Sequence, residues 1–441
     1  MGDSCCVMLA PYLTLKDTSS FSVFEICMKS DEIQKKPRVA IHNSVNCSYS
    51  RGIVASCISR RPWCIPVKSR YLDLAEHSSE KADLPTLQIG DFENIRWELV
   101  MGNGQHHGAS SYLVRKGLSR KAQLALQIRR FTAKRPNSIL NEAVPFTLIV
   151  ETWGAFDEMS LDGFGKGAVF EVNDLPLRIR LDVCLYDAKS VVESYEKISW
   201  RWILKPSVTN KGSNIVLCEN WKDVVENLEE MEEQREWVLQ RYVESPMLVL
   251  SEGHKFHLRV YVLCVDALKV HVFNQMLVLI AAHHYDAEDT DDVYRHLTNT
   301  ARAVEDIEFD EAKFVKVIED LPDITGESVA DVEKIKGQIY AITSELFSAF
   351  EAEYTVFAPL DNCFEIYGLD FMLSEDGAVH LLEVNPGPDF KQTGGRLKRV
   401  IEDLWEGAFR IVVDKEAADP RFTCCYDKKA STSGLGGMTL T

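Results

Sequence analysis

The chain has 441 residues, of which 46% are hydrophobic and 26% are charged, a composition typical of a soluble globular protein with two or three sub-domains. Its formal net charge of −18 argues against general binding to nucleic acid, and no apolar run approaches the roughly 18 residues that span a membrane. Because Asp3 stands where a secretory signal would carry basic residues, we expect a cytoplasmic protein.

The first part of the chain divides into a segment without clear periodicity and a basic segment. Residues 1–88 are treated as an N-terminal extension without a predicted fold. Residues 89–185 are expected to form a small N-terminal domain, in which Arg115 to Arg135 holds eight basic residues and no acidic one. Such a basic helical face is usually only solvated, but it can also attract an acidic substrate or the phosphates of a nucleotide.

Two apolar runs follow, at Phe146 to Val150 and at Leu177 to Tyr186, and both are predicted as strands. The second run would lead into a central sub-domain over residues 186–240.

A strand at Trp200 to Leu204 runs into a turn of small polar residues, with Lys205 and Lys211 on its two shoulders. Backbone N–H groups in such a turn can fold over phosphates. The turn lacks the residue order of a Walker A loop.

The run from Lys255 to Tyr261 alternates strictly, so Lys255, His257 and Arg259 share one face of a predicted strand. Three potential cations on one face repel one another unless an anion lies between them. A polyphosphate would supply that anion, because Lys and Arg form strong charge-assisted bonds to phosphate oxygens.

The stretch from Phe364 to Gly387 reads as a β-hairpin, two apolar runs joined by a short polar loop that ends in glycine. If that loop sets the register, Asp370 lies opposite Leu381, and Glu383 and Asn385 follow on the same face.

Two carboxylates and an amide on one face can hold a hard cation such as Mg²⁺ and leave positions open for phosphate oxygens. The alternative is a surface hairpin with ordinary solvated acids. It is the weaker reading, because acids between apolar strand residues destabilise the fold unless they are paired or ligated.

In their order and spacing, these motifs resemble the tubulin–tyrosine ligase-like family, a branch of the ATP-grasp ligases. The resemblance extends from about residue 95 to 412 and rests on the stretches QRYVESPMLV, KFHLRVYVL, HLTN, and YGLDFML followed by LLEVN. It implies an α+β ATP-grasp fold in which two α+β sub-domains, 186–240 and 241–415, clasp ATP. The smaller N-terminal domain precedes them along the chain. Residues 416–441 would form a tail.

The activity that the resemblance implies is that of an ATP-dependent acid–amino-acid ligase. In this family ATP phosphorylates a carboxylate, and the amine of an amino acid attacks the acyl phosphate to form an amide. The cofactors would be ATP and Mg²⁺. The partners would be a free amino acid and a protein acceptor with an acidic tail, for which tubulin is one possibility.

The resemblance also carries residue roles onto matching positions. Asp370, Glu383 and Asn385 would be the metal ligands, and Arg259 and Lys255 the catalytic residues, with Arg259 stabilising the transferring phosphoryl group. The nucleotide would be bound by Lys121, Lys205, Lys211, Gln240, Arg241, Tyr242, Val243, Lys255, His257 and Asn299.

Three positions depart from the family pattern. The family usually has Asp where this chain has His257, a substrate-binding Arg where it has Leu279, and Gly where it has Asn214. Loss of the arginine leaves the added amino acid open. Two hypotheses therefore stand: an active ligase that joins an amino acid to a protein carboxylate, and an ATP-binding pseudo-ligase that serves as a protein-interaction module.

Overall fold

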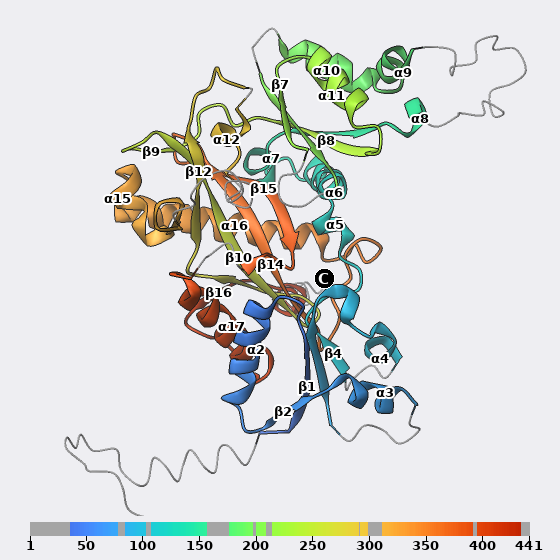
Figure 1. The fold of residues 1–441 in the computed structure, drawn as a ribbon, viewed down its shortest axis with the longest axis vertical. Coiled ribbons are helices and arrows are strands. Elements are labelled where there is room, and N and C mark those ends of the chain that lie inside the picture. The colour runs from blue at the N-terminus through green and yellow to red at the C-terminus, as the bar shows by residue number, and fades with distance from the viewer. Residues whose placement is uncertain are drawn as a thin grey trace, which may run out of the picture.

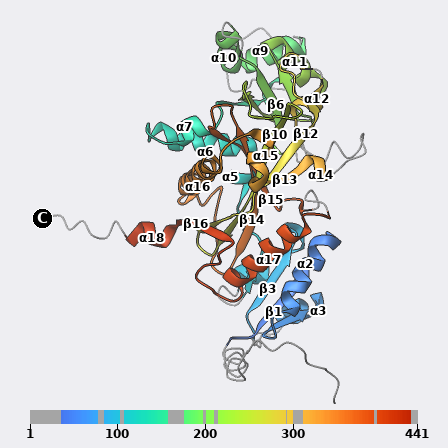
Figure 2. The same ribbon diagram turned by 90° about the vertical axis from the view of Figure 1, so that its left-hand side faces the viewer.

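Within the part of the chain that the structure describes, the strands form three sheets that follow one another along the long axis of the molecule (Figure 1). Figure 2 shows the same succession after a quarter turn. The computed structural model describes residues 36–77, 84–102, 107–156, 176–196, 200–208, 214–290, 292–298, 311–390 and 395–433. No helix in these ranges is long and apolar enough to cross a membrane.

The sheet at the bottom of Figure 1 is parallel, with the strand order β2-β1-β3-β4. Its elements are β1 (Val39–Ser44), α2 (Ser48–Ser59), β2 (Cys64–Val67), α3 (Ser69–His77), β3 (Thr86–Gly90), the 3₁₀ turn Phe92–Asn94, α4 (Trp97–Gly102) and β4 (His107–Ala109). Because β2 and β3 lie on opposite sides of β1, the chain changes direction between β1 and β3. The carboxyl ends of strands at such a point form a crevice.

This sheet corrects the treatment of residues 1–88 as an extension without a fold. Its strands have only three to six residues, and one helical crossover separates each from the next. Ile41 and Ile89 pack against side chains of a helix near the C-terminus of the chain. A local pattern does not reveal a partner more than 300 positions away.

The sheet at the top of Figure 1 is antiparallel, with the order β5-β8-β6-β7. Its strands are β5 (Thr147–Glu151), β6 (Trp202–Pro206), β7 (Val216–Cys218) and β8 (Glu236–Arg241), and the helices packed with it are α8 (Trp153–Phe156), α9 (Leu177–Cys184), α10 (Tyr186–Glu196) and α11 (Trp221–Glu230). The predicted strands at Phe146 to Val150 and Trp200 to Leu204 are confirmed as β5 and β6, within one or two residues.

The prediction of a strand at Leu177 to Tyr186 is wrong, because this run is helix α9 and the start of α10. The buried positions Leu181, Leu185, Ala188 and Val192 recur every three or four residues, the period of a helix. The predicted boundary at residue 186 therefore falls between two helices of one unit. That unit also includes β5, which the sequence placed in the preceding domain.

The middle sheet has eight strands and contains the predicted hairpin. Its strands are β9 (Leu248–Val249), β10 (His254–Val265), β11 (Lys269–Phe273), β12 (Leu277–His284), β13 (Val315–Val317), β14 (Phe364–Leu373), β15 (Val379–Pro386) and β16 (Phe422–Asp427). Its surrounding helical elements are α5 (Lys116–Ser119), α6 (Lys121–Ala133), α7 (Leu140–Ala143), α12 (Val293–His296), α14 (Glu311–Phe314), the 3₁₀ turn Ile318–Asp320, α15 (Leu321–Thr325), α16 (Val329–Phe350), α17 (Lys398–Val412) and α18 (Lys428–Ser433).

Strand β16 corrects the reading of residues 416–441 as a tail, because Phe422–Asp427 pairs with β11 along its length. Residues 434–441 lie outside the described residues.

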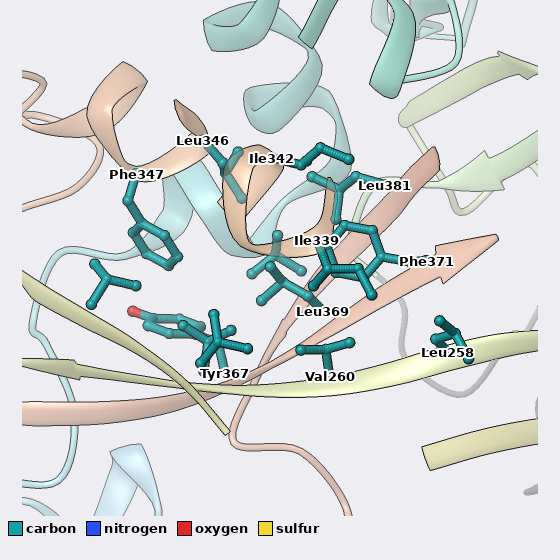
Figure 3. Packing of buried hydrophobic residues seen from close by; sticks show 14 of the residues in the cluster. Leu258, Val260, Ile339, Ile342, Leu346, Phe347, Tyr367, Leu369, Phe371 and Leu381 are labelled. Atoms are coloured by element: carbon teal, nitrogen blue, oxygen red, sulfur yellow. The ribbon is translucent and has the colours of Figure 1, made fainter. Parts of the chain in front are cut away.

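Strand β10 lies at the centre of this sheet, and all twelve of its residues are buried. Leu258 and Val260 belong to the face that packs against α16, together with Tyr367, Leu369 and Phe371 of β14 (Figure 3). On the other face, Tyr261 and the apolar residues after it pack with α17 and the parallel sheet. The first part of that face carries Lys255, His257 and Arg259.

The hairpin is confirmed, but its predicted register is wrong. Asp370 lies opposite Glu383, Gly368 lies opposite Asn385, and Phe371 lies opposite Leu381, so Leu382 is an extra residue in β15. This β-bulge shifts the pattern by one position. It places Asp370, Glu383 and Asn385 on one face. The prediction also placed these three residues on one face, but with a different register.

Candidate functional site

A cleft lies between the antiparallel sheet and the middle sheet, and it holds about 770 Å³ of space, including space open to solvent. Residues from both sheets line it: Ile203, Lys205, Ile215, Gln240, Arg241, Tyr242, Val243, Lys255, His257, Arg259, His296, Leu297, Thr298, Asp370, Met372, Leu382 and Glu383.

The carboxylate of Asp370 is held by a bidentate ion pair. Arg259 donates from Nε to Oδ1 (2.5 Å) and from Nη2 to Oδ2 (3.0 Å), and the two residues lie opposite each other on β10 and β14. Burial raises the pKa of Asp370 in spite of the attraction of Arg259. Because both side chains are less than a tenth exposed, the pair is a fixed part of the cleft wall.

Glu383 takes its positive partners from another part of the chain. Its Oε2 lies 3.2 Å from Nζ of Lys121, at the start of α6. Burial works against ionisation of Glu383, but Lys121 and Lys205 outweigh it and hold its pKa below the ordinary value. The amide of Asn385 donates to Asp370 and Glu383, at 3.1 Å each, and so joins the two carboxylates.

Two buried lysines face the same cleft with neutral partners. Lys205 donates to Oε1 of Gln240 (2.8 Å), and Lys255 donates to the hydroxyl of Tyr242 (2.7 Å). That hydroxyl lies 2.8 Å from Nδ1 of His296. Burial lowers the pKa of Lys205 to about 8 and, with help from Lys205, that of Lys255 to about 7. Neutral oxygen partners leave the positive charge of both side chains available to an anion.

His257 lies between the lysines and the Arg259–Asp370 pair. Its Nδ1 is 2.5 Å from the hydroxyl of Thr298, and its Nε2 is 3.7 Å from Oδ1 of Asp370. Burial, followed by the charge of Arg259, lowers the pKa of His257 to about 3. The imidazole is therefore neutral near neutral pH.

The cleft brings together most of the residues that the sequence singled out. Lys121 and Asn385 contact Glu383 at its edge. The side chain of Arg241 instead lies over the ring of Trp200, 3.8 Å from its centre. Lys211 and Asn299 lie outside the described residues. Asn214, at the end of the same turn, has a φ of 57°, in agreement with its expected tolerance of left-handed backbone.

The apolar part of the lining was not predicted from the sequence, and it consists of Ile203, Ile215, Leu297, Met372 and Leu382. Strand alternation could have found Met372, two positions after Asp370 on the same face. Leu382 could not be found in this way, because it faces the cleft only through the bulge.

A larger cavity, with about 1590 Å³ of space when space open to solvent is included in the same way, lies at the carboxyl ends of β1, β3 and β4. Its other wall is the segment from Pro386 to Phe390, which follows directly on Asn385. The lining includes Asp91, Glu93 and Asp389. It also contains buried Glu365 in an ion pair with Arg115.

The donor set at the hairpin suits Mg²⁺, since it offers two carboxylates and an amide oxygen and leaves the other positions to phosphates. Among the described residues, no three His, Cys, Asp or Glu side chains lie close enough together to form a metal site by themselves. Arg259 and Lys121 hold the two carboxylates instead. A metal would therefore be bound jointly with a polyphosphate.

The fold belongs to the ATP-grasp class. It is similar to the solved C-terminal domain of Pby1 from K. lactis, described as an ATP-grasp enzyme that interacts with the mRNA decapping enzyme Dcp2. The two structures superpose with a TM-score of 0.64 and 26% sequence identity, over 89% of this chain and 99% of that domain. The predicted α+β ATP-grasp fold is thus confirmed.

Residues 171–420 match the tubulin-tyrosine ligase family, and the chain belongs to this family. The probable tubulin–tyrosine ligase PBY1 of Saccharomyces cerevisiae is 28% identical over 75% of this chain, and a probable tubulin–tyrosine ligase of Schizosaccharomyces pombe is 29% identical over 74%. The matches cover 46% and 82% of those proteins. Tubulin glycylase 3D of Tetrahymena thermophila is 26% identical over 48% of this chain.

Proposed function

We propose that this protein is an ATP-dependent carboxylate–amine ligase, which activates a protein carboxylate as an acyl phosphate and joins an amino acid to it. One observation carries the proposal. Lys205 from the antiparallel sheet, and Lys255, Arg259, Asp370 and Glu383 from the middle sheet, converge on a single cleft between the two sheets. Such an arrangement suits a polyphosphate, whose transfer requires cations held in place beforehand.

In the proposed complex, adenine lies against the backbone from Gln240 to Val243 and the apolar lining, and the lysines bind phosphate oxygens. Arg259 stabilises the transferring phosphoryl group. It already lies fixed against Asp370, so little reorganisation is needed when charge develops. The proposed ligands of Mg²⁺ are Asp370, Glu383 and Asn385, and the ion, when bound, neutralises negative charge on the phosphates.

The larger cavity offers room for the substrates that are joined. Its wall continues the strand that carries Asn385, and Asp91, Glu93 and Asp389 favour the amino group of an amino acid over a carboxylate. An acidic acceptor would be attracted instead by the segment from Arg115 to Arg135, which contains α5 and α6. Six of the eight basic side chains between Arg115 and Arg135 are exposed there.

The position expected to bind the carboxylate of the added amino acid does not indicate which amino acid that is. Leu279 is 1% exposed and packs in the core near α17, so it offers no charge to the cleft. The names of the relatives include ligases for tyrosine and for glycine.

The second candidate is an ATP-binding pseudo-ligase that acts as a protein-interaction module. The observation that favours it is the similar Pby1 domain, which is described as interacting with a decapping enzyme. In this function the cleft would bind nucleotide without turnover.

The deciding experiment measures release of ADP from ATP by the full chain, with mixed amino acids and a cytosolic extract as the source of acceptor. A ligase releases ADP only when amino acid and acceptor are both present. We expect Glu383→Gln to lower this release by about 100-fold or more, because it removes the negative charge of a proposed Mg²⁺ ligand.

The matched control is Glu375→Gln in the loop of the same hairpin, where the side chain is exposed. It should release ADP at the rate of the unaltered chain. ATP binding by calorimetry without amino-acid-dependent release would overturn the ligase and leave the pseudo-ligase.

A further inference from the structure

The first turn of α2 opens into the larger cavity. Asn46, the N-cap Cys47 and Ser50 all line it. The side chain of Cys47 makes no capping hydrogen bond, and the first turn holds no acidic residue. Asp91 accepts a hydrogen bond from the N–H of Asn46, before the helix begins (2.7 Å). The N–H groups of a helix end, together with the helix dipole, favour an anion.

A second donor lies at the same cavity and belongs to α17. Trp405 lines the cavity and is 6% exposed, and among the described residues its Nε1 has no hydrogen-bond partner. Because an indole nitrogen can only donate, the partner it lacks is an acceptor. Helices α2 and α17 pack in one hydrophobic cluster, so the two kinds of donor lie on neighbouring elements. A carboxylate would suit both.

The rest of the charged lining has the opposite preference. Asp91, Glu93 and Asp389 line the cavity, and the only basic side chain among its described lining residues is Arg115. Arg115 is already in an ion pair with Glu365. A cavity with this balance attracts an ammonium group and repels a ligand with excess negative charge. Donors for a carboxylate and acids for an ammonium group together fit a zwitterion.

Asp389 lies where the cavity borders the cleft. It follows Pro388, and Cβ of Pro388 and Cδ of Arg259 each lie 3.1 Å from the point that a Cβ on Gly368 would occupy. Arg259 in turn is bonded to Asp370 in the cleft. An amine held at Asp389 would therefore lie near the phosphoryl group that Arg259 is proposed to stabilise.

We propose that this cavity binds the free amino acid, with its carboxylate at the start of α2 and at Nε1 of Trp405, and its ammonium group at Asp389. The inference rests on the proposed function for the identity of the ligand. The start of α2 and Trp405 would take the place of the arginine that the family has at position 279, because Leu279 is buried in the core and carries no charge.

The apolar lining indicates the class of amino acid. Rings and aliphatic side chains contribute to the wall beside Trp405, namely Ile89, Phe92, Phe364, Ile366 and Phe390. Such a lining favours a large apolar side chain. The three carboxylates disfavour an acidic one, so the site should take a neutral, apolar amino acid in preference to glutamate.

The test is isothermal titration calorimetry of the full chain with four probes. These are L-phenylalanine, phenethylamine, which lacks the carboxylate, 3-phenylpropionate, which lacks the amino group, and L-glutamate. We expect L-phenylalanine to bind at least tenfold more tightly than each of the other three, because it alone has both charged groups and an apolar side chain.

Two substitutions assign the two ends of the ligand. Trp405→Phe keeps a ring and removes the N–H, so it should weaken L-phenylalanine binding at least fivefold and leave phenethylamine binding unchanged. Asp389→Asn should weaken both of these ligands at least fivefold and should not weaken 3-phenylpropionate. The matched control is Trp63→Phe, whose Nε1 is also buried without a partner among the described residues but which does not line the cavity. It should leave all four affinities unchanged.

Absence of L-phenylalanine binding, equal affinity for phenethylamine or L-glutamate, or equal weakening of L-phenylalanine and phenethylamine in Trp405→Phe would overturn the proposal. Retained phenethylamine binding also shows that this variant is folded. ADP release, measured separately, distinguishes the two proposals. The expected binding without release removes the ligase and keeps the site, whereas amino-acid-dependent release that neither substitution alters removes the site and keeps the ligase.

Discussion

Lys205 and Lys255 are 6% and 3% exposed, and each donates to a neutral oxygen rather than to a carboxylate. A buried charge without an opposite charge is costly, and its pKa falls toward neutrality, as the pKa values of both lysines do. An anion in the cleft would reverse this shift. A bound polyphosphate would therefore stabilise the charged forms of both lysines.

His271 allows a prediction about stability at the scale of one residue. It is 2% exposed on β11, opposite Cys424 of β16, and burial followed by the charge of Lys269 lowers its pKa to about 4. The unfolded chain binds this proton near pH 6.5. Between these values the unfolded state binds more protons, so the free energy of unfolding should fall by roughly 3 kcal/mol as pH drops from 7 to 4.

The measurement compares urea unfolding of the unaltered chain and His271→Leu across this pH range. The variant should lose less stability on acidification by about that amount. Equal pH slopes for the two proteins would show that His271 is not held neutral by burial.

The pairing of the charged residues that line the cleft could not be predicted from the sequence. The alternation from Lys255 to Arg259 placed Lys255, His257 and Arg259 on one face, and the structure confirms this placement, although His257 is neutral there. The sequence assigned Asp370 to a metal and did not anticipate its bidentate bond with Arg259, 111 positions away. The sequence of one strand shows which side chains share a face. The partners of those side chains depend on the register between strands that are far apart in the chain.

At the scale of the element, the β-bulge at Leu382 decides which side chains of β15 face the cleft. Leu381 and Val384 belong to the core, while Leu382 and Glu383 both line the cleft. A regular strand would place Leu382 with Val384. Because of the bulge, Leu381 and Glu383 face opposite sides of the sheet although they lie only two positions apart in β15.

This arrangement predicts different effects for two neighbouring leucines. Leu381→Ala should lower the free energy of unfolding by about 2 to 5 kcal/mol, because Leu381 is 1% exposed in the core. Leu382→Ala should cost less than about 1 kcal/mol and weaken nucleotide binding instead. Chemical denaturation and calorimetry of both variants test this, and a large loss of stability in Leu382→Ala alone would contradict the bulge.

At the scale of the whole molecule, the hydrophobic clusters do not coincide with the three sheets. One cluster joins α2, β1 and β3 of the parallel sheet to β10, β14 and α17. Another is confined to the antiparallel sheet and helices α8 to α11. The parallel sheet therefore shares its core with the middle sheet, while the antiparallel sheet has a core of its own and forms the more independent wall of the cleft.

Two buried leucines test this division. Leu404→Ala in α17 should lower hydrogen-exchange protection in α2 and β1 as well as in α17, because these elements share one cluster. Leu228→Ala in α11, also fully buried, should lower protection only in the antiparallel sheet and its helices. Loss of protection in α2 with Leu228→Ala would mean that the whole chain unfolds as one unit.

The sequence by itself determined the strands with strict alternation, the hairpin and the polar residues of the cleft. It did so because a period of two and a polar loop are local signals, and because the order of the motifs matches one family. It failed for residues 39–90, whose short strands are buried by contacts with α17, and for Leu177–Cys184, where a helix was read as a strand.

Only the tertiary structure decided the register at Leu382, the pairing of Arg259 with Asp370 and the position of Lys121 beside Glu383. Each of these depends on contacts between residues or strands whose alignment no local pattern specifies. The physical reason is the same in each case. A strand's own sequence sets which residues share a face, but the neighbours that pack against it set which groups those residues meet.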